Sequence, residues 1–342
     1  MTEAVNRQFY LHQRPEGRPT SDDVRRRDVA VPSPGQGQVL IKNLYFSIDP
    51  AIRGWMRDEP NYLPPIELGA PIRSTTVGRV VESRHPDFAE GDEVWGMNAW
   101  EDYSVAEGGT LVKIPADNQY PLQYYLDIFG AVGMTPYFGL LEAGQIKSGQ
   151  TVLMSAAAGA VGSLGGQIAK IKGCKVVGLA GSDEKCRWIT EDLGFDKAIN
   201  YKTCGSLVDA IAEACPEGVD VYFDNVGGEI LDAALLNLRD HARIVFCGAI
   251  SGYNAKEPVP GPYNWWQILA KSAVVQGYLV SNYFDRFPEG VKQMAQWLEE
   301  GRIHFREEIV DGFENTLEAF QKLFDGTNEG KMIVRVEDDS AA

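Results

Sequence analysis

The sequence predicts an α/β protein in which a doubly wound parallel sheet follows a β-rich, barrel-like domain. Three observations support this prediction: short β-type runs between Pro- and Gly-containing turns up to about residue 124, alternating strands and helices from about residue 125, and a glycine turn within that alternation. A chain of 342 residues is long enough for two domains. The predicted divisions are 1–124, 125–299 and a C-terminal segment, 300–342, that returns to the first domain.

Runs of strand length lie between turn residues in the first division. The clearest are 37–49, 75–83 and 91–97. A basic run, Arg25–Arg27, has aspartates on both sides. We interpret it as a solvated surface and not as a binding patch.

In the second division, strand patterns alternate with helix patterns. The expected strands are 151–156, 175–180, 198–201, 219–226, 243–249 and 272–280, and the expected helices are 160–172, 183–193, 206–214 and 228–239. Such alternation implies right-handed crossovers and a parallel sheet, whose ligands bind beyond the carboxyl ends of the strands. After residue 300 we expect a strand in 304–313, an amphipathic helix in 314–326 and a closing strand in 331–337.

Small residues occupy the turn between the first strand and the first helix of this alternation. The turn reads Ala157-Ala158-Gly159-Ala160-Val161-Gly162. A dinucleotide site needs such residues because the turn is tight, the backbone approaches the pyrophosphate and the helix packs closely on the strand. Alanine can replace the first glycine of the usual fingerprint if its φ stays negative. The surrounding βα units favour a dinucleotide turn over a junction that binds nothing.

No acidic residue closes the second strand, which ends at Ala180-Gly181-Ser182. In an NAD site an Asp or Glu at this place binds the ribose hydroxyls, and its absence removes a charge that would repel a 2′-phosphate. Ser182 can cap the next helix, Lys185 supplies a cation one turn later, and Tyr201 follows the third strand with a hydroxyl. These residues predict NADP(H) as the cofactor.

Composition and charge exclude several other classes. The net charge of -16 argues against nucleic acid or an anionic membrane as a partner. The five cysteines have no CxxC spacing and the four histidines no cluster, so we expect reduced thiols and no metal site. With no signal peptide and no apolar run of membrane-spanning length in the sequence, we expect a cytoplasmic protein that does not enter a membrane.

Stretches throughout the chain resemble the zinc-independent medium-chain dehydrogenase/reductase superfamily. They include SIDPAIRGWM, TTVGRVVES, SAAAGAVGS, GSDEK, GFDKAINYKT, FDNVGGE, CGAISGYN and DGTNEGKMIV. The chain is most similar to the group of prostaglandin reductases (leukotriene B4 12-hydroxydehydrogenases), alkenal double-bond reductases and curcumin reductases. This resemblance implies a GroES-like catalytic domain completed by the C-terminal segment, a Rossmann domain and a homodimer.

The resemblance also assigns cofactor contacts by matching motif. Besides Ser182, which comes from its position alone, they are Gly159, Ala160, Val161, Gly162, Lys185, Tyr201, Asn225, Cys247, Gly248, Ala249, Ile250, Ser251, Tyr253, Tyr278, Leu279, Val280 and Asn328. Two features differ from relatives. The family tyrosine near the substrate is Ala51 in this chain, and the ligand Cys and GHE motif of the zinc-dependent enzymes are missing.

The implied reaction is reduction by NADPH of a carbon–carbon double bond conjugated to a carbonyl, in a small-molecule enone or enal. The developing oxyanion needs hydrogen-bond donors, for which Tyr253 and the nicotinamide ribose hydroxyl are the candidates. Tyr253 either delivers the proton or only positions the ribose, with water as the alternative proton source. Two other functions stay open at this point: an NADPH:quinone oxidoreductase and a non-catalytic NADPH-binding protein.

Overall fold

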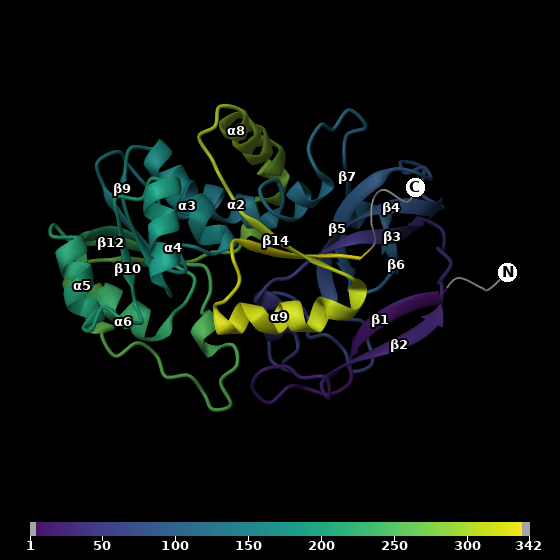
Figure 1. Cartoon of the computed structure of the whole chain (residues 1–342), viewed down its shortest axis with the longest axis horizontal. Helices are drawn as coiled ribbons and strands as arrows, with labels where there is room; N and C mark the ends of the chain where they lie inside the picture. Colours follow the sequence, from purple (N-terminus) through teal and green to yellow (C-terminus); the bar gives the residue numbers. More distant parts are fainter. Residues whose placement is uncertain (1–4, 337–342) are drawn as a thin grey trace. The chain divides into compact units, whose positions relative to one another are not determined.

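The computed structural model describes residues 5–336, and the chain forms two compact units (Figure 1). The first unit comprises Met1–Leu126 together with Glu307–Ala342, and the second comprises Asp127–Arg306. The chain after Arg306 therefore belongs to the same unit as the N-terminal half.

A mostly antiparallel sheet of seven strands forms the body of the first unit. Its strands follow the order β14-β15-β3-β4-β5-β7, and β6 pairs with β3. Their bounds are β3 Gln38–Ser47, β4 Arg73–Ser83, β5 Glu93–Ala99, β6 Tyr103–Glu107, β7 Leu111–Lys113, β14 Glu307–Asp311 and β15 Lys331–Arg335. The strands expected in 37–49, 75–83 and 91–97 are β3, β4 and β5.

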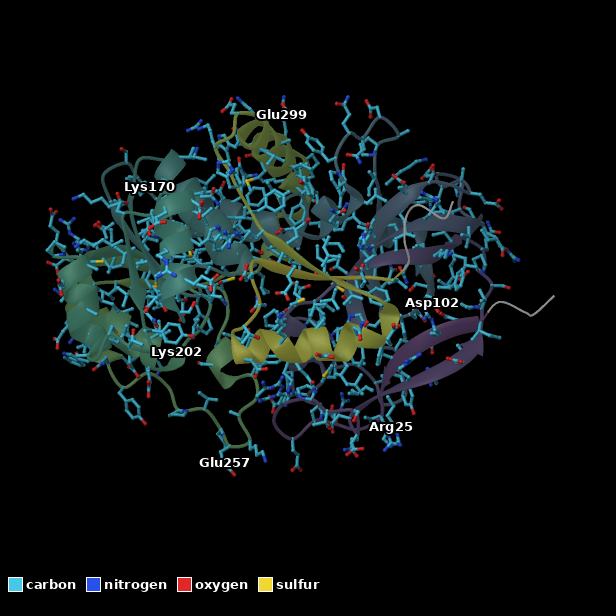
Figure 2. All side chains as sticks on the ribbon, in the orientation of Figure 1. Arg25, Asp102, Lys170, Lys202, Glu257 and Glu299 are labelled. Atoms are coloured by element: carbon cyan, nitrogen blue, oxygen red, sulfur yellow. The ribbon has the colours of Figure 1, made fainter. Side chains whose placement is uncertain are left out.

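The basic run lies on a strand that sequence reasoning missed. Strand β2 (Val24–Ala30) pairs with β1 (Val5–Leu11) in an antiparallel ribbon. Arg25 and Arg26 are exposed, as the solvated interpretation predicts, and Arg25 is labelled at the surface in Figure 2. The guanidinium of Arg27 lies 4.6 Å from the centroid of the Tyr10 ring, so this charge rests on an aromatic face.

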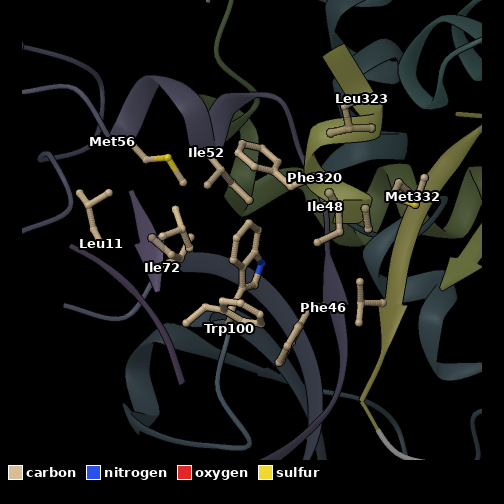
Figure 3. Packing of buried hydrophobic residues seen from close by; sticks show 14 of the residues in the cluster. Leu11, Phe46, Ile48, Ile52, Met56, Ile72, Trp100, Phe320, Leu323 and Met332 are labelled. Atoms are coloured by element: carbon tan, nitrogen blue, oxygen red, sulfur yellow. The ribbon is translucent and has the colours of Figure 1, made fainter. Parts of the chain in front are cut away.

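The C-terminal helix and strand complete the core of the first unit (Figure 3). Phe320 on α9 (Thr316–Asp325) packs edge-on against Trp100, with ring centroids 5.4 Å apart. Met332 on β15 joins the same cluster. Because one face of α9 is apolar, the helix is stable only where that face is covered, and here it covers residues of β3 and of helix α1 (Ala51–Trp55).

The second unit is the doubly wound sheet that the sequence predicts. Its six parallel strands follow the order β10-β9-β8-β11-β12-β13, which in chain order reads 3-2-1-4-5-6. The bounds are β8 Thr151–Met154, β9 Lys175–Ala180, β10 Lys197–Asn200, β11 Val219–Asp224, β12 Leu238–Phe246 and β13 Val274–Gly277, with helices α3 Ala160–Ile171, α4 Asp183–Arg187, α5 Leu207–Ala214 and α6 Gly228–Leu236. The order reverses between β8 and β11, where such folds bind their ligands.

Three helices of this unit were not predicted, one of which is the short helix α7 (Trp266–Ala270). Helix α2 (Ala131–Phe138) contains Pro136, which weakens its sequence pattern. Helix α8 (Phe287–Glu299) has a readable signal, a proline in its first turn and buried residues at helical spacing. The helix expected in 183–193 is shorter, because α4 passes into a π-helical turn at Trp188–Asp192.

Candidate active site

The predicted phosphate turn is shaped by a close approach between its own backbone segments. A Cβ atom at Gly162 would lie 2.3 Å from the carbonyl oxygen of Ala156, so no larger residue fits there. Gly159 is the N-cap of α3, and the left-handed residue is Ala156, with φ of 48°. Ala157 is not among the residues of positive φ, so the condition for replacing the first glycine is met.

Strand β9 makes room for the alanine at the first glycine position. Ala157 is fully buried, and its amide donates to the Leu179 carbonyl at 3.0 Å. A Cβ atom at Gly178 on β9 would lie 2.8 Å from the Cβ of Ala157. The methyl group therefore occupies space that a side chain on β9 would need, and the turn keeps its close contact with the sheet.

The predicted 2′-phosphate residues gather at the carboxyl end of β9. The Ser182 hydroxyl accepts a hydrogen bond from the Lys185 amide at 3.2 Å and so caps α4, as predicted. A Cβ atom at Gly181 would lie 2.7 Å from the Tyr201 hydroxyl and 3.3 Å from Lys202 Cε. Burial raises the pKa of Tyr201, so its hydroxyl stays a donor. Lys202 is a second cation here, which sequence reasoning missed although it follows Tyr201 directly (Figure 2).

An acidic residue does lie close to this group, one position beyond Ser182. The Asn200 amide donates to the Asp183 carboxylate at 2.7 Å and holds it beside β10. The place at the end of β9 itself remains without an acid, since it is occupied by Ala180, Gly181 and Ser182. The arrangement keeps the charge pattern that the sequence indicates for NADP(H).

A buried carboxylate organises the switch point between β8 and β11. Asp224 ends β11, is fully buried, and accepts hydrogen bonds from the Tyr222 hydroxyl at 2.7 Å and from the Gly227 amide at 2.9 Å. Burial raises the pKa of Asp224. Asn225, a predicted cofactor contact, donates its side-chain amide to the Ser155 carbonyl at 2.9 Å. Asp224 was missed because only the fold reveals that it is buried.

The loop that carries Tyr253 is fastened to the same residue. The Asp224 carbonyl accepts from the amides of Cys247 at 2.9 Å and Gly248 at 3.0 Å. The Ala249 amide donates to the Tyr253 hydroxyl at 3.3 Å, which uses a lone pair of the hydroxyl and not its proton. Burial raises the pKa of Tyr253, so the group stays protonated at neutral pH and can donate. Burial also raises the pKa of the Cys247 thiol to about 12, which keeps it from reacting as a thiolate.

The side chains of two further predicted contacts, Tyr278 and Asn328, make hydrogen bonds within the protein. The Tyr278 side chain is buried, and its hydroxyl donates to the Met134 carbonyl at 3.4 Å, so only its backbone is left for a ligand. Asn328 belongs to the first unit, where its amide donates to the Gly330 carbonyl at 3.2 Å. The neighbouring Lys331 is 2% exposed and donates to the Asp49 carboxylate at 2.8 Å, which ties this loop to the SIDPAIR motif.

The motif with the missing tyrosine forms the start of helix α1. Ala51 is half-buried at its first position, and Arg53 is buried and donates to the carbonyls of Pro15 and Gly17 at 3.0 Å. Arg53 is therefore a structural residue. Of the aromatic residues near this helix, Trp55 is buried and Tyr62 is 49% exposed.

Over residues 5–336 no three His, Cys, Asp or Glu side chains are grouped so that they could hold a metal ion. In the same part of the chain, no helix has the length and apolar character needed to cross a membrane.

Comparisons with known proteins show the family of this chain. The family model described as the N-terminal domain of oxidoreductase matches residues 7–114, and the one described as zinc-binding dehydrogenase matches residues 160–300. The putative NADP-dependent oxidoreductase YfmJ of Bacillus subtilis is 46% identical and covers 98% of this chain and 99% of its own. The NADPH-dependent curcumin reductase of Escherichia coli is 44% identical, covering 98% of both chains. The NADP(+)-dependent 2-alkenal reductase of Nicotiana tabacum is 40% identical, also covering 98% of both.

A solved structure extends the agreement to three dimensions. CurA from Vibrio vulnificus in complex with NADPH is 39% identical, with a TM-score of 0.92 over 97% of this chain and 99% of its own. A quinone oxidoreductase of Escherichia coli in complex with NADPH, at 20% identity and a TM-score of 0.77, shares the fold over 96% of this chain and 99% of its own. The resemblance drawn from the sequence motifs is thereby confirmed.

Proposed function

Because this chain belongs to the medium-chain dehydrogenase/reductase family, in the group of the curcumin and 2-alkenal reductases, we propose that it is an NADPH-dependent reductase of carbon–carbon double bonds in α,β-unsaturated ketones and aldehydes. The observation that carries the proposal is the joint arrangement at the sheet edge. The Gly162 turn is followed by an acid-free strand end that bears Ser182, Lys185 and Tyr201. That combination suits a dinucleotide with a 2′-phosphate.

The residues present fit NADP(H). The pyrophosphate would meet the turn Gly159–Gly162, whose backbone no side chain at Gly162 covers. The 2′-phosphate would meet Ser182, Lys185 and Tyr201. When bound, NADPH supplies the hydride for the β-carbon of the substrate.

We propose that Tyr253 donates a hydrogen bond to the carbonyl oxygen of the substrate, and that its phenol or water then protonates the α-carbon of the enolate. As the double bond is reduced, negative charge develops on the carbonyl oxygen, and a preorganised neutral donor stabilises it. The Asp224 backbone holds the loop at Cys247 and Gly248, and the Ala249 amide holds the phenol oxygen. The hydroxyl proton can then point toward the oxyanion.

The proposal is tested by NADPH oxidation with a panel of enones, enals, quinones and saturated carbonyl compounds, using NADPH deuterated at C4. We expect turnover of the enones and enals, with deuterium on the β-carbon of a saturated ketone. Deuterium on the carbinol carbon would contradict the mechanism. Turnover of simple quinones alone would favour a quinone oxidoreductase, and NADPH binding without any turnover would favour a binding protein.

We also propose that the protein is a homodimer that pairs through β13. This strand ends the sheet order and exposes Val274 and Val275. The neighbouring helix α7 (Trp266–Ala270) exposes Trp266 at 69% and Leu269 at 65%. A bare apolar strand edge favours pairing, and a two-fold axis perpendicular to the sheet would pair two β13 strands antiparallel.

Sedimentation of the purified protein should give twice the mass of the chain, and Val275→Lys should shift it toward the monomer mass. A monomer in the parent protein would contradict this proposal. As a matched control, Val5→Lys changes a similarly exposed valine of the other unit and should leave the mass unchanged.

A cytoplasmic location remains our proposal. All five cysteines are free thiols, and two of them, Cys174 and Cys215, are buried. Unpaired thiols are typical of proteins from reducing compartments.

A further inference from the structure

The side chain of Asp224 holds the backbone turn that follows β11. Its Oδ1 atom accepts hydrogen bonds from the amides of Val226 and Gly227, both at 2.9 Å, and from the Tyr222 hydroxyl at 2.7 Å. The Oδ2 atom is buried and has no hydrogen-bond partner among the described residues. One oxygen of the carboxyl group therefore makes the contacts with the turn.

The turn depends on this support because two glycines form part of it. Gly227 and Gly228 have φ of 68° and 55°, in the left-handed region. Glycine enters this region and many others at little cost, so the local sequence leaves the conformation of the turn open. Hydrogen bonds to a buried oxygen favour one conformation, since they are stronger where water is excluded.

The loop that carries Tyr253 rests on this turn. The Ser251 hydroxyl donates to the Val226 carbonyl at 2.6 Å. A Cβ atom at Gly227 would lie 3.2 Å from the Cβ of Ala249, so the two segments are in close contact. Ala249 is also the residue whose amide donates to the Tyr253 hydroxyl oxygen. A displacement of the turn would therefore displace the group that holds the phenol.

Asn225, a predicted cofactor contact, belongs to the same turn. Its amide donates to the Ser155 hydroxyl at 2.8 Å, and that hydroxyl lies 3.3 Å from Asp224 Oδ1. Its backbone carbonyl accepts from the Ile250 amide at 3.2 Å. Because the Asp224 side chain is fully buried, it acts through these groups and not by touching a ligand.

We propose that Asp224 is a positioning residue, whose side chain sets the Tyr253 hydroxyl for the reaction through the turn of residues 225–228. The proposal rests on the proposed reductase function and on the role proposed there for Tyr253. A donor stabilises a developing oxyanion best when it is already oriented, because a loose donor must first be ordered. Loss of the support should therefore slow the chemical step more than it weakens substrate binding.

The experiment introduces Asp224 variants into the parent protein and into Tyr253→Phe. In the parent, Asp224→Ala should lower kcat for an enone roughly tenfold, with NADPH saturating, and change KM for the enone by less than about twofold. In Tyr253→Phe the same change should lower kcat by less than about twofold, because the hydroxyl that it positions is already missing. Asp224→Asn keeps a carbonyl oxygen as acceptor and should retain most of the parent kcat.

A matched control lies at the other end of the same strand. Asp220 accepts a hydrogen bond from the Thr151 amide at 2.8 Å, so Asp220→Ala also removes a carboxylate that holds backbone, and it should leave kcat nearly unchanged. If Asp224→Ala does not fold, Gly227→Ala tests the same connection, because its added methyl group is strained at positive φ and presses on Ala249. It should lower kcat in the parent and much less in Tyr253→Phe.

The outcomes separate the positioning role from the function on which it rests. Equal losses of kcat in the two backgrounds would show that Asp224 only supports the fold, and would overturn the proposal while the reductase stands. If the parent reduces no enone, the function fails, and hydrogen–deuterium exchange tests the positioning directly. The amides of residues 247–251 should then exchange roughly tenfold faster in Asp224→Ala than in the parent, and unchanged exchange would refute the proposal.

Discussion

Tyr253→Phe should lower kcat for enone reduction by roughly tenfold to a hundredfold and change KM for the enone by less than about twofold. The hydroxyl matters most when charge develops on the substrate oxygen, so its loss affects the transition state more than the bound substrate. Its oxygen is already held by the Ala249 amide, and the pKa of the phenol is raised, so the parent group is a preoriented neutral donor. Steady-state kinetics with NADPH saturating measures both constants.

A matched control comes from another tyrosine of the same unit. Tyr137 is buried, with its ring centroid 6.0 Å from that of Trp297, and Tyr137→Phe should leave kcat nearly unchanged. An unchanged kcat in Tyr253→Phe would remove this hydroxyl from the chemistry. A raised KM for NADPH with unchanged kcat would instead show that Tyr253 only positions the cofactor.

Lys185→Ala should weaken NADPH binding by roughly tenfold or more and leave NADH binding nearly unchanged. The Lys185 side chain follows the capped end of α4, where its charge would meet a 2′-phosphate that NADH lacks. Fluorescence titration of both cofactors gives the two dissociation constants. Lys170→Ala is the control, because Lys170 is paired with Asp196 at 2.8 Å.

Lys202→Ala provides an independent check on the same phosphate. Its side chain lies against Gly181, so we expect a smaller loss than for Lys185→Ala, again confined to NADPH. Equal affinity of the parent protein for NADPH and NADH would contradict both expectations, because neither lysine would then bind the 2′-phosphate.

Much of the second unit could be predicted because its signals are local. The alternation of strands and helices implies a parallel sheet, and the observed strand order places the glycine turn at the switch point. Ser182, Lys185 and Tyr201 were predicted as site residues from their positions at strand ends, and in the structure Ser182 caps α4 and Tyr201 lies against Gly181 at that edge. Position along a strand is a property that a single sequence carries.

Contacts between distant segments were decided only by the tertiary structure. Ala157 fits because Gly178 on the neighbouring strand has no side chain, and Asp224 is a buried organiser because β8 and β12 flank β11. Likewise, Arg73 lies over Trp55 only once β4 and α1 are packed together. Sequence determined which residues stand at the ends of the strands. Packing decided which of them touch, because burial and proximity depend on segments far apart in the chain, and no local pattern encodes that distance.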